Sequence, residues 1–259
     1  MPVLPKGIDL GLRAPLRGAA EKVSLNVADH DRMFAGDGAH YLRCGASALT
    51  VLHMATVLAG IRPAAILDFG SGAGRVTRWM RAHWPAARIA ATDLREEDLA
   101  FCAAEFGCTT FPSGTDIAAL QAPGRYDLIW AGSVLTHLDQ ARAEALVARL
   151  LSWTRPDGVV VASLHGRFVA GRGAATRRYG LDEPGWARLL EGYRGEAAFG
   201  YADYPPTPGY GVSLSRPAWA AALAERLPGA RLLLFGERLW DGHHDVLALQ
   251  GRGIDAPGG

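Results

Sequence analysis

From Pro63 onward, short apolar runs alternate with segments of helical period, and this alternation constrains the fold of the 259-residue chain more than any other feature. Alternation of this kind is typical of βα units, whose parallel strands form one sheet with helices on both faces. We therefore predict an α/β fold with a doubly wound, mostly parallel sheet. The expected strands are 64–69, 88–92, 108–111, 126–131 and 158–164, separated by helices at 74–84, 96–106, 116–120 and 140–153.

The alternation stops between Gly166 and Ser215, a stretch rich in glycine, proline and aromatic residues that holds five of the seven tyrosines. We expect this stretch to be an insertion that forms a lid over a cleft. The α/β pattern then returns with a helix at 217–227 and strands at 230–234 and 244–249. These two strands are close enough to form a hairpin, which completes a seven-stranded sheet with an antiparallel last strand.

The predicted domain organisation follows from these segments. Residues 1–60 precede the sheet and form an N-terminal helical cap with one helix at about 41–58, and residues 61–165 form the core. A lid at 166–215 is followed by the end of the core at 216–250 and by an expected flexible tail at 251–259.

The charge balance excludes one class of partner. Lysines and arginines total 27 against 26 aspartates and glutamates, a formal net charge of +1, so the chain lacks the basic surface of a nucleic-acid or anionic-membrane binder. Three cysteines, Cys44, Cys102 and Cys108, form no CxxC pair, which favours structural thiols in a reducing compartment. The sequence has no secretory leader and no apolar run of about 20 residues, so we expect a cytoplasmic protein.

The segment Ile66–Arg75, ILDFGSGAGR, carries the chemistry: a strand runs into closely spaced glycines and then into a helix. Glycines allow a tight turn and the close approach of a ligand, and the free N–H groups at a helix start favour a negative group. Asp93 follows Gly70 by 23 residues, at the end of the next expected strand, where a carboxylate can accept both hydroxyls of a ribose. The combination predicts a nucleotide-type cofactor site.

The spacing of the glycines distinguishes two classes of cofactor. A dinucleotide fingerprint requires G-x-G-x-x-G, but Gly70, Gly72 and Gly74 form G-x-G-x-G and Arg75 occupies the sixth position. With Asp68 before it, this loop resembles motif I of the class I S-adenosylmethionine (SAM)-dependent methyltransferases. In that family the acidic residue at the strand end and the glycine loop hold the methionine part of the cofactor, and a second acidic residue holds the ribose.

Further segments match the same family in the expected order. Ala91–Leu94 resembles its second motif, which assigns the ribose to Asp93. Ser113–Ile117 resembles the adenine-contacting turn, with Asp116 placed to accept from the exocyclic amine. Tyr126–Leu138 resembles the fourth-strand motif. The order of these matches, more than any one of them, supports the resemblance.

The resemblance covers about residues 60–165 well and 217–250 moderately. It implies the Rossmann-like methyltransferase fold of the bacterial small-molecule branch, with SAM as cofactor. Four of the implied contacts have simpler alternatives. Asp68 could cap a helix or turn, and Asp93 could be a solvated strand end. Asp116 could cap a short helix, and Arg43, which could meet the cofactor's carboxylate, could belong to a plain helix start. The implied cofactor-binding residues are Arg43, Asp68, Gly70, Ser71, Gly72, Gly74, Arg75, Asp93, Leu94, Thr115, Asp116, Ile117, Gly132 and Ser133.

Four of the eight histidines are expected to converge on one rim of the sheet, where the carboxyl ends of parallel strands meet. His137 and His165 follow the fourth and fifth strands, and His243 and His244 lie in the last hairpin. We predict His165, His243 and His137 as catalytic candidates, because a histidine with a pKa near neutrality can act as a general base. His137 could instead bond a backbone carbonyl. Histidines beside Asp245 would suit a metal ion, but without a spaced ligand motif we predict no metal site.

These observations predict a methyltransferase that moves a methyl group from SAM to a hydroxyl, or less readily an amine, of a small molecule such as a sugar or natural-product scaffold. Aromatic residues of the lid could line the acceptor pocket. An NAD(P)-dependent oxidoreductase would share the sheet and Asp93, although Arg75 counts against it. A non-catalytic SAM-binding protein stays open, because a fold and a cofactor site do not establish turnover. We expect no nucleic-acid or membrane partner, and homodimerisation stays open.

Overall fold

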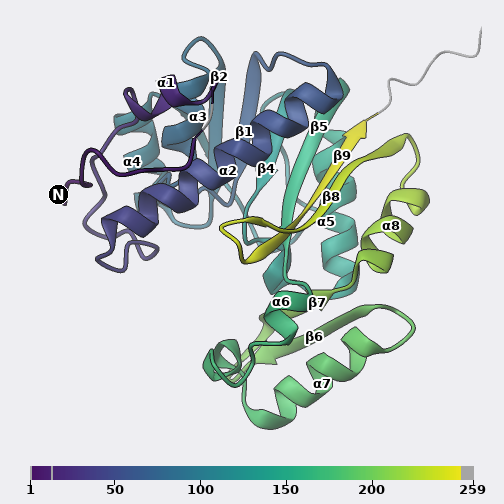
Figure 1. Ribbon diagram of the computed structural model, residues 1–259. Helices are drawn as coiled ribbons and strands as arrows, with labels where there is room; N and C mark the ends of the chain where they lie inside the picture. Colours follow the sequence, from purple (N-terminus) through teal and green to yellow (C-terminus); the bar gives the residue numbers. More distant parts are fainter. Residues whose placement is uncertain (1, 13, 252–259) are drawn as a thin grey trace, which may run out of the picture.

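The computed structural model describes residues 2–12 and 14–251. Its centre is a seven-stranded sheet with the strand order β3-β2-β1-β4-β5-β9-β8 (Figure 1). The first five strands are parallel, and β9 is antiparallel to both of its neighbours. This arrangement confirms the predicted doubly wound sheet with an antiparallel last strand. The strands are β1 (Ala65–Phe69), β2 (Arg88–Asp93), β3 (Thr109–Pro112), β4 (Tyr126–Ala131), β5 (Thr154–Leu164), β8 (Ala230–Trp240) and β9 (His244–Gly251).

The strand order reverses between β1 and β4, and this reversal positions the site. The chain runs outward from β1 through β2 to β3 and then returns to β4 on the other side of β1. Leu67 of β1 lies opposite Ala90 of β2 and Ile129 of β4. A reversal of this kind opens a crevice beyond the carboxyl ends of the strands. The loops that follow β1, β2 and β4 therefore meet at one edge.

Helices cover both faces of the sheet. On one face, α2, α3 and α4 pack through a core that includes Leu52, Met80 and Cys102, all fully buried. On the other face, α5 and α8 pack through a second core that includes Leu146 and Trp219. Burial of these side chains on both faces fixes the layers, since each removes apolar surface from water. The helices are α2 (Gly38–Ala59), α3 (Thr77–His83), α4 (Glu96–Phe106), α5 (Gln140–Ser152) and α8 (Pro217–Arg226).

The N-terminal segment, which contains the short helix α1 (Arg17–Ala20), is joined to the core by a buried arginine. Arg78 of α3 is 1% exposed, and its guanidinium donates to the carbonyls of Ser24 and Asn26 at 3.0 and 2.8 Å. The same guanidinium lies over the ring of Tyr41 in α2. Because a buried charge is costly without acceptors, these bonds hold the segment against α2 and α3.

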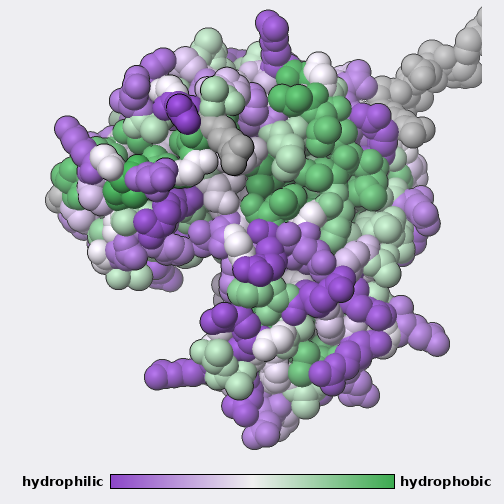
Figure 2. Space-filling model, in the orientation of Figure 1, coloured by the Kyte–Doolittle hydropathy of each residue, from purple (hydrophilic) through white to green (hydrophobic). Residues whose placement is uncertain are grey.

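Residues expected to form a lid contain their own small sheet, at the lower end of the molecule in Figure 1. Both ends of the segment attach near the end of β5, where the Ser215 N–H donates to the His165 carbonyl at 2.8 Å. Figure 2 shows the surface indented between this unit and the body that carries α2. No strand is predicted here from the sequence, because glycines and prolines interrupt any alternation. The elements are α6 (Arg167–Ala170), η2 (Arg177–Gly180), α7 (Glu183–Arg194), β6 (Phe199–Tyr204) and β7 (Thr207–Ser215).

Two predicted helices near the glycine loop need correction. The predicted helix at 116–120 is a turn, in which Asp116 Oδ1 accepts the Ala118 N–H at 3.0 Å, because so short a segment gains too little from its own helical hydrogen bonds. The helix predicted from residue 74 begins instead at Thr77, since the φ of 80° at Gly74 prolongs the loop.

Strands at the far edge of the sheet are longer than predicted. β8 reaches Trp240 because register shifts between Leu232 and Leu234 and between Gly236 and Trp240 let it keep pairing with β9. Gly251 ends β9 rather than beginning a tail, while 252–259 lie outside the described residues.

One helix, α2, is long and apolar enough to cross a membrane by length and composition, which corrects the expectation that no such run exists. In this fold, 56% of its apolar window is buried inside the protein. Leu49 and Leu52, for example, are fully buried against the core. The apolar character of α2 is thus accounted for by packing on the sheet.

Candidate active site

The glycine loop at the end of β1 is shaped by positive φ angles. Gly70, Gly72 and Gly74 have φ values of 75°, 51° and 80°, a region that L side chains rarely adopt. The N–H groups of Gly70 and Ser71 donate to the Thr92 carbonyl at 2.8 and 3.1 Å, which ties the loop to β2. A Cβ built at Gly72 would meet no heavy atom within 4 Å. The loop therefore borders open space, as a cofactor cradle requires.

The Asp93 carboxylate fastens this loop to the end of β2. Its Oδ2 accepts the Gly72 N–H at 2.8 Å, and its Oδ1 accepts the N–H groups of Leu94 and Arg95 at 2.8 and 3.2 Å. The side chain is half-buried, and its oxygens retain lone pairs for further donors. A carboxylate beside the open space at Gly72 can accept ribose hydroxyls, so the residues present fit the nucleoside part of SAM.

Asp68 lies beneath the loop rather than at its surface. The side chain is 1% exposed, and its Oδ2 accepts the Thr77 hydroxyl at 2.6 Å. Burial raises the pKa of Asp68 to about 7; the hydrogen bond from Thr77 opposes this rise, and the charge of Asp93 adds to it. The carboxylate supports the start of α3, and its contact with the methionine part of a cofactor stays a prediction.

Because the Asp68 carboxyl is buried, we expect the free energy of unfolding to depend on pH, and we expect Asp68→Asn to remove this dependence. The folded pKa of about 7 lies above the ordinary value of 3.8, so the folded state holds the proton more tightly. The contribution of Asp68 is therefore fully present below pH 3.8 and declines as pH rises to about 7. Urea unfolding at about pH 5 and about pH 8 gives the free energy of unfolding at each pH. Asp68→Asn should reduce the difference between these two free energies by at least about 1 kcal/mol. An unchanged difference would contradict the assignment.

The segment expected to contact adenine lies at the surface beyond β2 and β3. Leu94 is 63% exposed, Thr115 and Asp116 are exposed, and Ile117 is half-buried. The exposed apolar side chain of Leu94, beside Asp93, can pack against the flat ring of an adenine base. The adenine contacts of these residues stay predictions.

Arg75, the residue that breaks the dinucleotide fingerprint, lies between two aromatic rings. Its guanidinium carbon is 6.0 Å from the ring centre of Tyr41 and 5.7 Å from that of Trp240. Trp240 Nε1 donates to the Cys44 carbonyl in α2 at 3.0 Å, which links α2 to the end of β8. Arg43, predicted to meet the cofactor, is exposed on α2. Sequence reasoning chose Arg43 on this helix and missed Tyr41 and Trp240, because no local pattern shows which side chains of α2 and β8 face the loop.

The turn after β4 connects the cofactor edge to the last hairpin. A Cβ at Gly70 would be 2.5 Å from a methyl of Val134, so this turn lies directly against the glycine loop. Gly132 and Ser133, both predicted cofactor contacts, belong to it. The Ser133 hydroxyl is 3.2 Å from Nε2 of His244.

Three of the histidines come together at the end of β5 and the start of β9. Candidate ligand atoms of His165, His243 and His244 all lie within 4.8 Å of one another. Burial lowers the pKa of His165 to about 3 and also lowers the pKa values of His243 and His244, so the rings are uncharged at neutral pH. A group with so low a pKa is a weak general base, which makes the half-buried His243 a better candidate than His165.

His137 serves a different contact. It lies in η1 (Leu135–His137), and its Nδ1 is 2.8 Å from the Gly211 carbonyl of β7. Its ring stacks on Tyr210, with ring centres 4.8 Å apart. Burial lowers the pKa of His137, so the neutral ring can donate to that carbonyl. This is the simpler alternative considered for His137, and it attaches the lid to the core.

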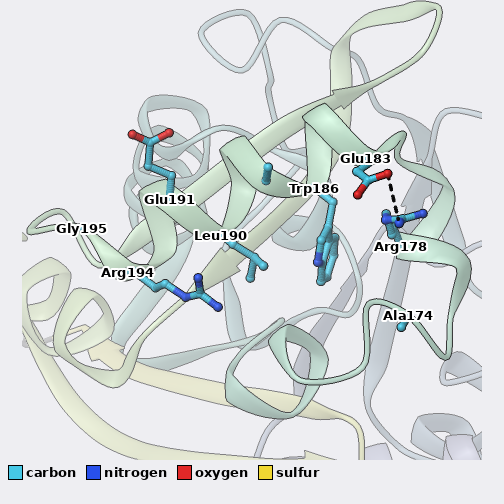
Figure 3. A pocket seen from close by; sticks show the side chains of 9 residues that line it. Ala174, Arg178, Glu183, Trp186, Leu190, Glu191, Arg194 and Gly195 are labelled. Atoms are coloured by element: carbon cyan, nitrogen blue, oxygen red, sulfur yellow. Dashed lines mark ion pairs between the residues drawn. The ribbon is translucent and has the colours of Figure 1, made fainter.

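A cavity of about 780 Å³ lies in the lid, against α7 (Figure 3). Trp186, Leu190 and Arg194 line it from α7, and the Arg178 side chain borders it from η2. Its described lining includes none of the predicted cofactor residues or clustered histidines. Trp186 also stacks on Tyr179, whose ring centre is 5.6 Å from that of His165. The lid thus contacts the histidines, while this cavity lies apart from them.

A model of the methyltransferase domain family matches residues 66–158. This range begins in β1 and ends in β5, so it contains the glycine loop, Asp93 and the turn after β4. The lid and the last hairpin lie outside it.

Two curated relatives match parts of the chain. A trans-aconitate 2-methyltransferase from Streptomyces avermitilis is 36% identical over 118 residues, which are 41% of this chain and 40% of that protein. A malonyl-[acyl-carrier protein] O-methyltransferase from Halalkalibacterium halodurans is 33% identical over 153 residues, 50% of this chain and 55% of that protein. The chain thus spans about half the length of these relatives, or less.

The fold is also found among solved structures. The 1,6-didemethyltoxoflavin-N1-methyltransferase of Burkholderia thailandensis, solved with 1,6-didemethyltoxoflavin and S-adenosylhomocysteine (SAH) bound, aligns with a TM-score of 0.55. The alignment covers 81% of this chain and 79% of that chain at 18% identity. At this identity the likeness establishes a shared fold.

Proposed function

We propose that this protein is a class I SAM-dependent methyltransferase that transfers a methyl group from SAM to a small molecule, since the methyltransferase domain model and both curated relatives match its core. The observation that carries the proposal is the joint geometry of Asp93 and the glycine loop. The carboxylate holds the Gly72 N–H beside open space, in the place where the family binds the ribose of its cofactor.

SAM, when bound, supplies an electrophilic methyl group on a sulfonium. The work of this chain is therefore to align the acceptor and to exclude water, rather than to build a covalent intermediate. The glycine loop and Asp93 bind the cofactor, and the turn at Gly132 and Ser133 lies against that loop. The lid, which contacts the histidines through Tyr179, covers the acceptor side.

We propose a hydroxyl as the acceptor atom, with an amine as the second candidate. A protein of related sequence is an O-methyltransferase and one of the same fold is an N1-methyltransferase, so the two candidate acceptor atoms each have a precedent. A hydroxyl must lose its proton when it is methylated. We propose His243 as the base that accepts this proton, ahead of His165 and His137. The near-neutral charge favours a small molecule over a nucleic acid as the substrate of a cytoplasmic enzyme.

Two other functions are the alternatives to methyl transfer. An NAD(P)-dependent oxidoreductase would need a dinucleotide cradle, and Arg75 occupies the place of its third glycine while lying over Tyr41 and Trp240. A non-catalytic SAM-binding protein would keep the cofactor site without turnover.

Calorimetric titration with SAM, SAH and NADPH, each on the full chain, tests the cofactor. We expect binding of SAM and SAH in about the micromolar range, or about −8 kcal/mol, and no binding of NADPH. Binding of NADPH alone would overturn the function and leave the fold intact. With the cofactor established, SAH accumulation in the presence of candidate hydroxyl or amine acceptors separates an enzyme from a non-catalytic binder.

A further inference from the structure

We propose that His165, His243 and His244 form a binding site for one divalent transition-metal ion such as Zn²⁺. The residues come from the end of β5 and the start of β9, and one ligand atom of each lies within 4.8 Å of the other two. Imidazole nitrogens are preferred ligands of such ions, and three of them leave a position free for another molecule. This inference replaces the expectation, drawn from the sequence, that the chain holds no metal.

Two of the ring nitrogens are buried without a partner. The Nδ1 atoms of His165 and His244 are inaccessible to solvent and form no hydrogen bond with the described residues. His165 as a whole is only 8% exposed. Buried polar atoms without a partner are uncommon and call for an explanation. An ion bound through both Nδ1 atoms would give each of them a partner.

The environment of His244 also suits a ligand. Its Nε2 lies 3.2 Å from the Ser133 hydroxyl, so a proton on Nε2 can be donated to that oxygen. This tautomer leaves the lone pair on the unpartnered Nδ1. A second hydrogen bond that orients the ring is typical of metal-bound histidines.

Coordination requires a small adjustment of the rings. Ligand nitrogens around tetrahedral Zn²⁺ lie roughly 3.3 Å apart, closer than the 4.8 Å limit seen here. The rings of His165 and His244 are nearly parallel, at 24°, so at least one of them must rotate. His243 already meets both at steep angles of 81° and 60°. We therefore expect binding to reorient side chains without moving the strands.

A role for the ion in methylation rests on the proposed function, whereas its binding does not. His244 contacts Ser133 in the turn beside the glycine loop, so the ion would lie on the acceptor side of the cofactor edge. A divalent cation there would lower the pKa of an acceptor hydroxyl. The hydroxyl proton would leave to solvent, the oxygen would take the methyl group, and the sulfonium would become the neutral thioether of SAH. With the ion bound, His165, His243 and His244 would be its ligands, so the ion would replace His243 in the role of base proposed above.

Calorimetric titration of the EDTA-treated, dialysed full chain with Zn²⁺, in the absence of SAM and acceptor, tests the site. We expect one ion per chain with a Kd of about 1 μM or lower. His165→Ala and His243→Asn should each weaken binding at least about a hundredfold. Both variants should retain SAH binding, which shows that they are folded.

His83→Asn provides the matched control. His83 and His53 are neighbouring histidines outside the proposed site, with ring nitrogens 3.3 Å apart. This variant should bind Zn²⁺ as the parent does. The site is disproved if the parent shows no saturable binding up to about 100 μM, or about −5.5 kcal/mol. It is equally disproved if the His165 and His243 variants match His83→Asn. Since SAH binding is read separately, a failure of the cofactor proposal would leave the metal result interpretable.

Discussion

Replacing Asp93 by alanine is expected to weaken SAH binding about a hundredfold, or about 2.7 kcal/mol. The variant loses the acceptor proposed for the ribose hydroxyls, and a hydrogen bond to a charged group contributes about 1.5–3 kcal/mol. It also loses the bonds that hold the N–H groups of Gly72, Leu94 and Arg95. Calorimetry with SAH measures the affinity, and urea unfolding in parallel measures any loss of stability.

Glu97→Ala is the control for this experiment. Glu97 lies in the first turn of α4, four residues after Asp93, and its side chain is 53% exposed and paired with Arg95. An exposed pair of this kind contributes little, so we expect the SAH affinity to change by less than about threefold. Unchanged SAH affinity in a folded Asp93→Ala variant would refute the proposal that Asp93 binds the cofactor.

Gly74→Ala is expected to destabilise the protein by about 3 kcal/mol. At φ 80° an L side chain is strained, which costs about 1–2 kcal/mol. The added Cβ would also lie 2.3 Å from the Phe106 ring and 3.1 Å from Cys102 Sγ, both buried in the core between α3 and α4. Overpacking at such a site costs about another 1–3 kcal/mol. The midpoint of urea unfolding measures the loss.

Gly72→Ala separates the two roles of the loop. Its φ of 51° is also positive, but a Cβ there would meet no heavy atom within 4 Å. We expect a stability loss of only about 1 kcal/mol together with weaker SAH binding, because the methyl occupies space beside Asp93. Equal destabilisation by both substitutions would contradict the packing described for Gly74.

Most of the core sheet and the glycine loop could be predicted from the sequence, because their signals are local. The run ILDF followed by closely spaced glycines specifies a buried strand and a turn within ten residues, and the predicted α4 and β4 match the structure residue for residue. Asp93 was placed from the same kind of information, since a strand end follows from where an apolar run stops.

The lid and the predicted helix at 116–120 show where such signals fail. β6 and β7 contain Gly200, Gly209 and Gly211 with prolines nearby, so their pairing leaves little alternation to detect. At 116–120 a helix-like sequence forms only a turn, because a segment so short gains too little from its own hydrogen bonds.

The sequence by itself determined the order of strands and helices, the glycine loop and the acidic residue that faces it. Only the tertiary structure decided that Arg75 lies between Tyr41 and Trp240, and that of the four histidines expected on one rim three cluster within 4.8 Å while His137 contacts the Gly211 carbonyl of the lid. The physical reason is that such contacts join segments far apart along the chain. Their formation depends on how β9 inserts between β5 and β8 and how α2 packs on the sheet, and no local periodicity records either event.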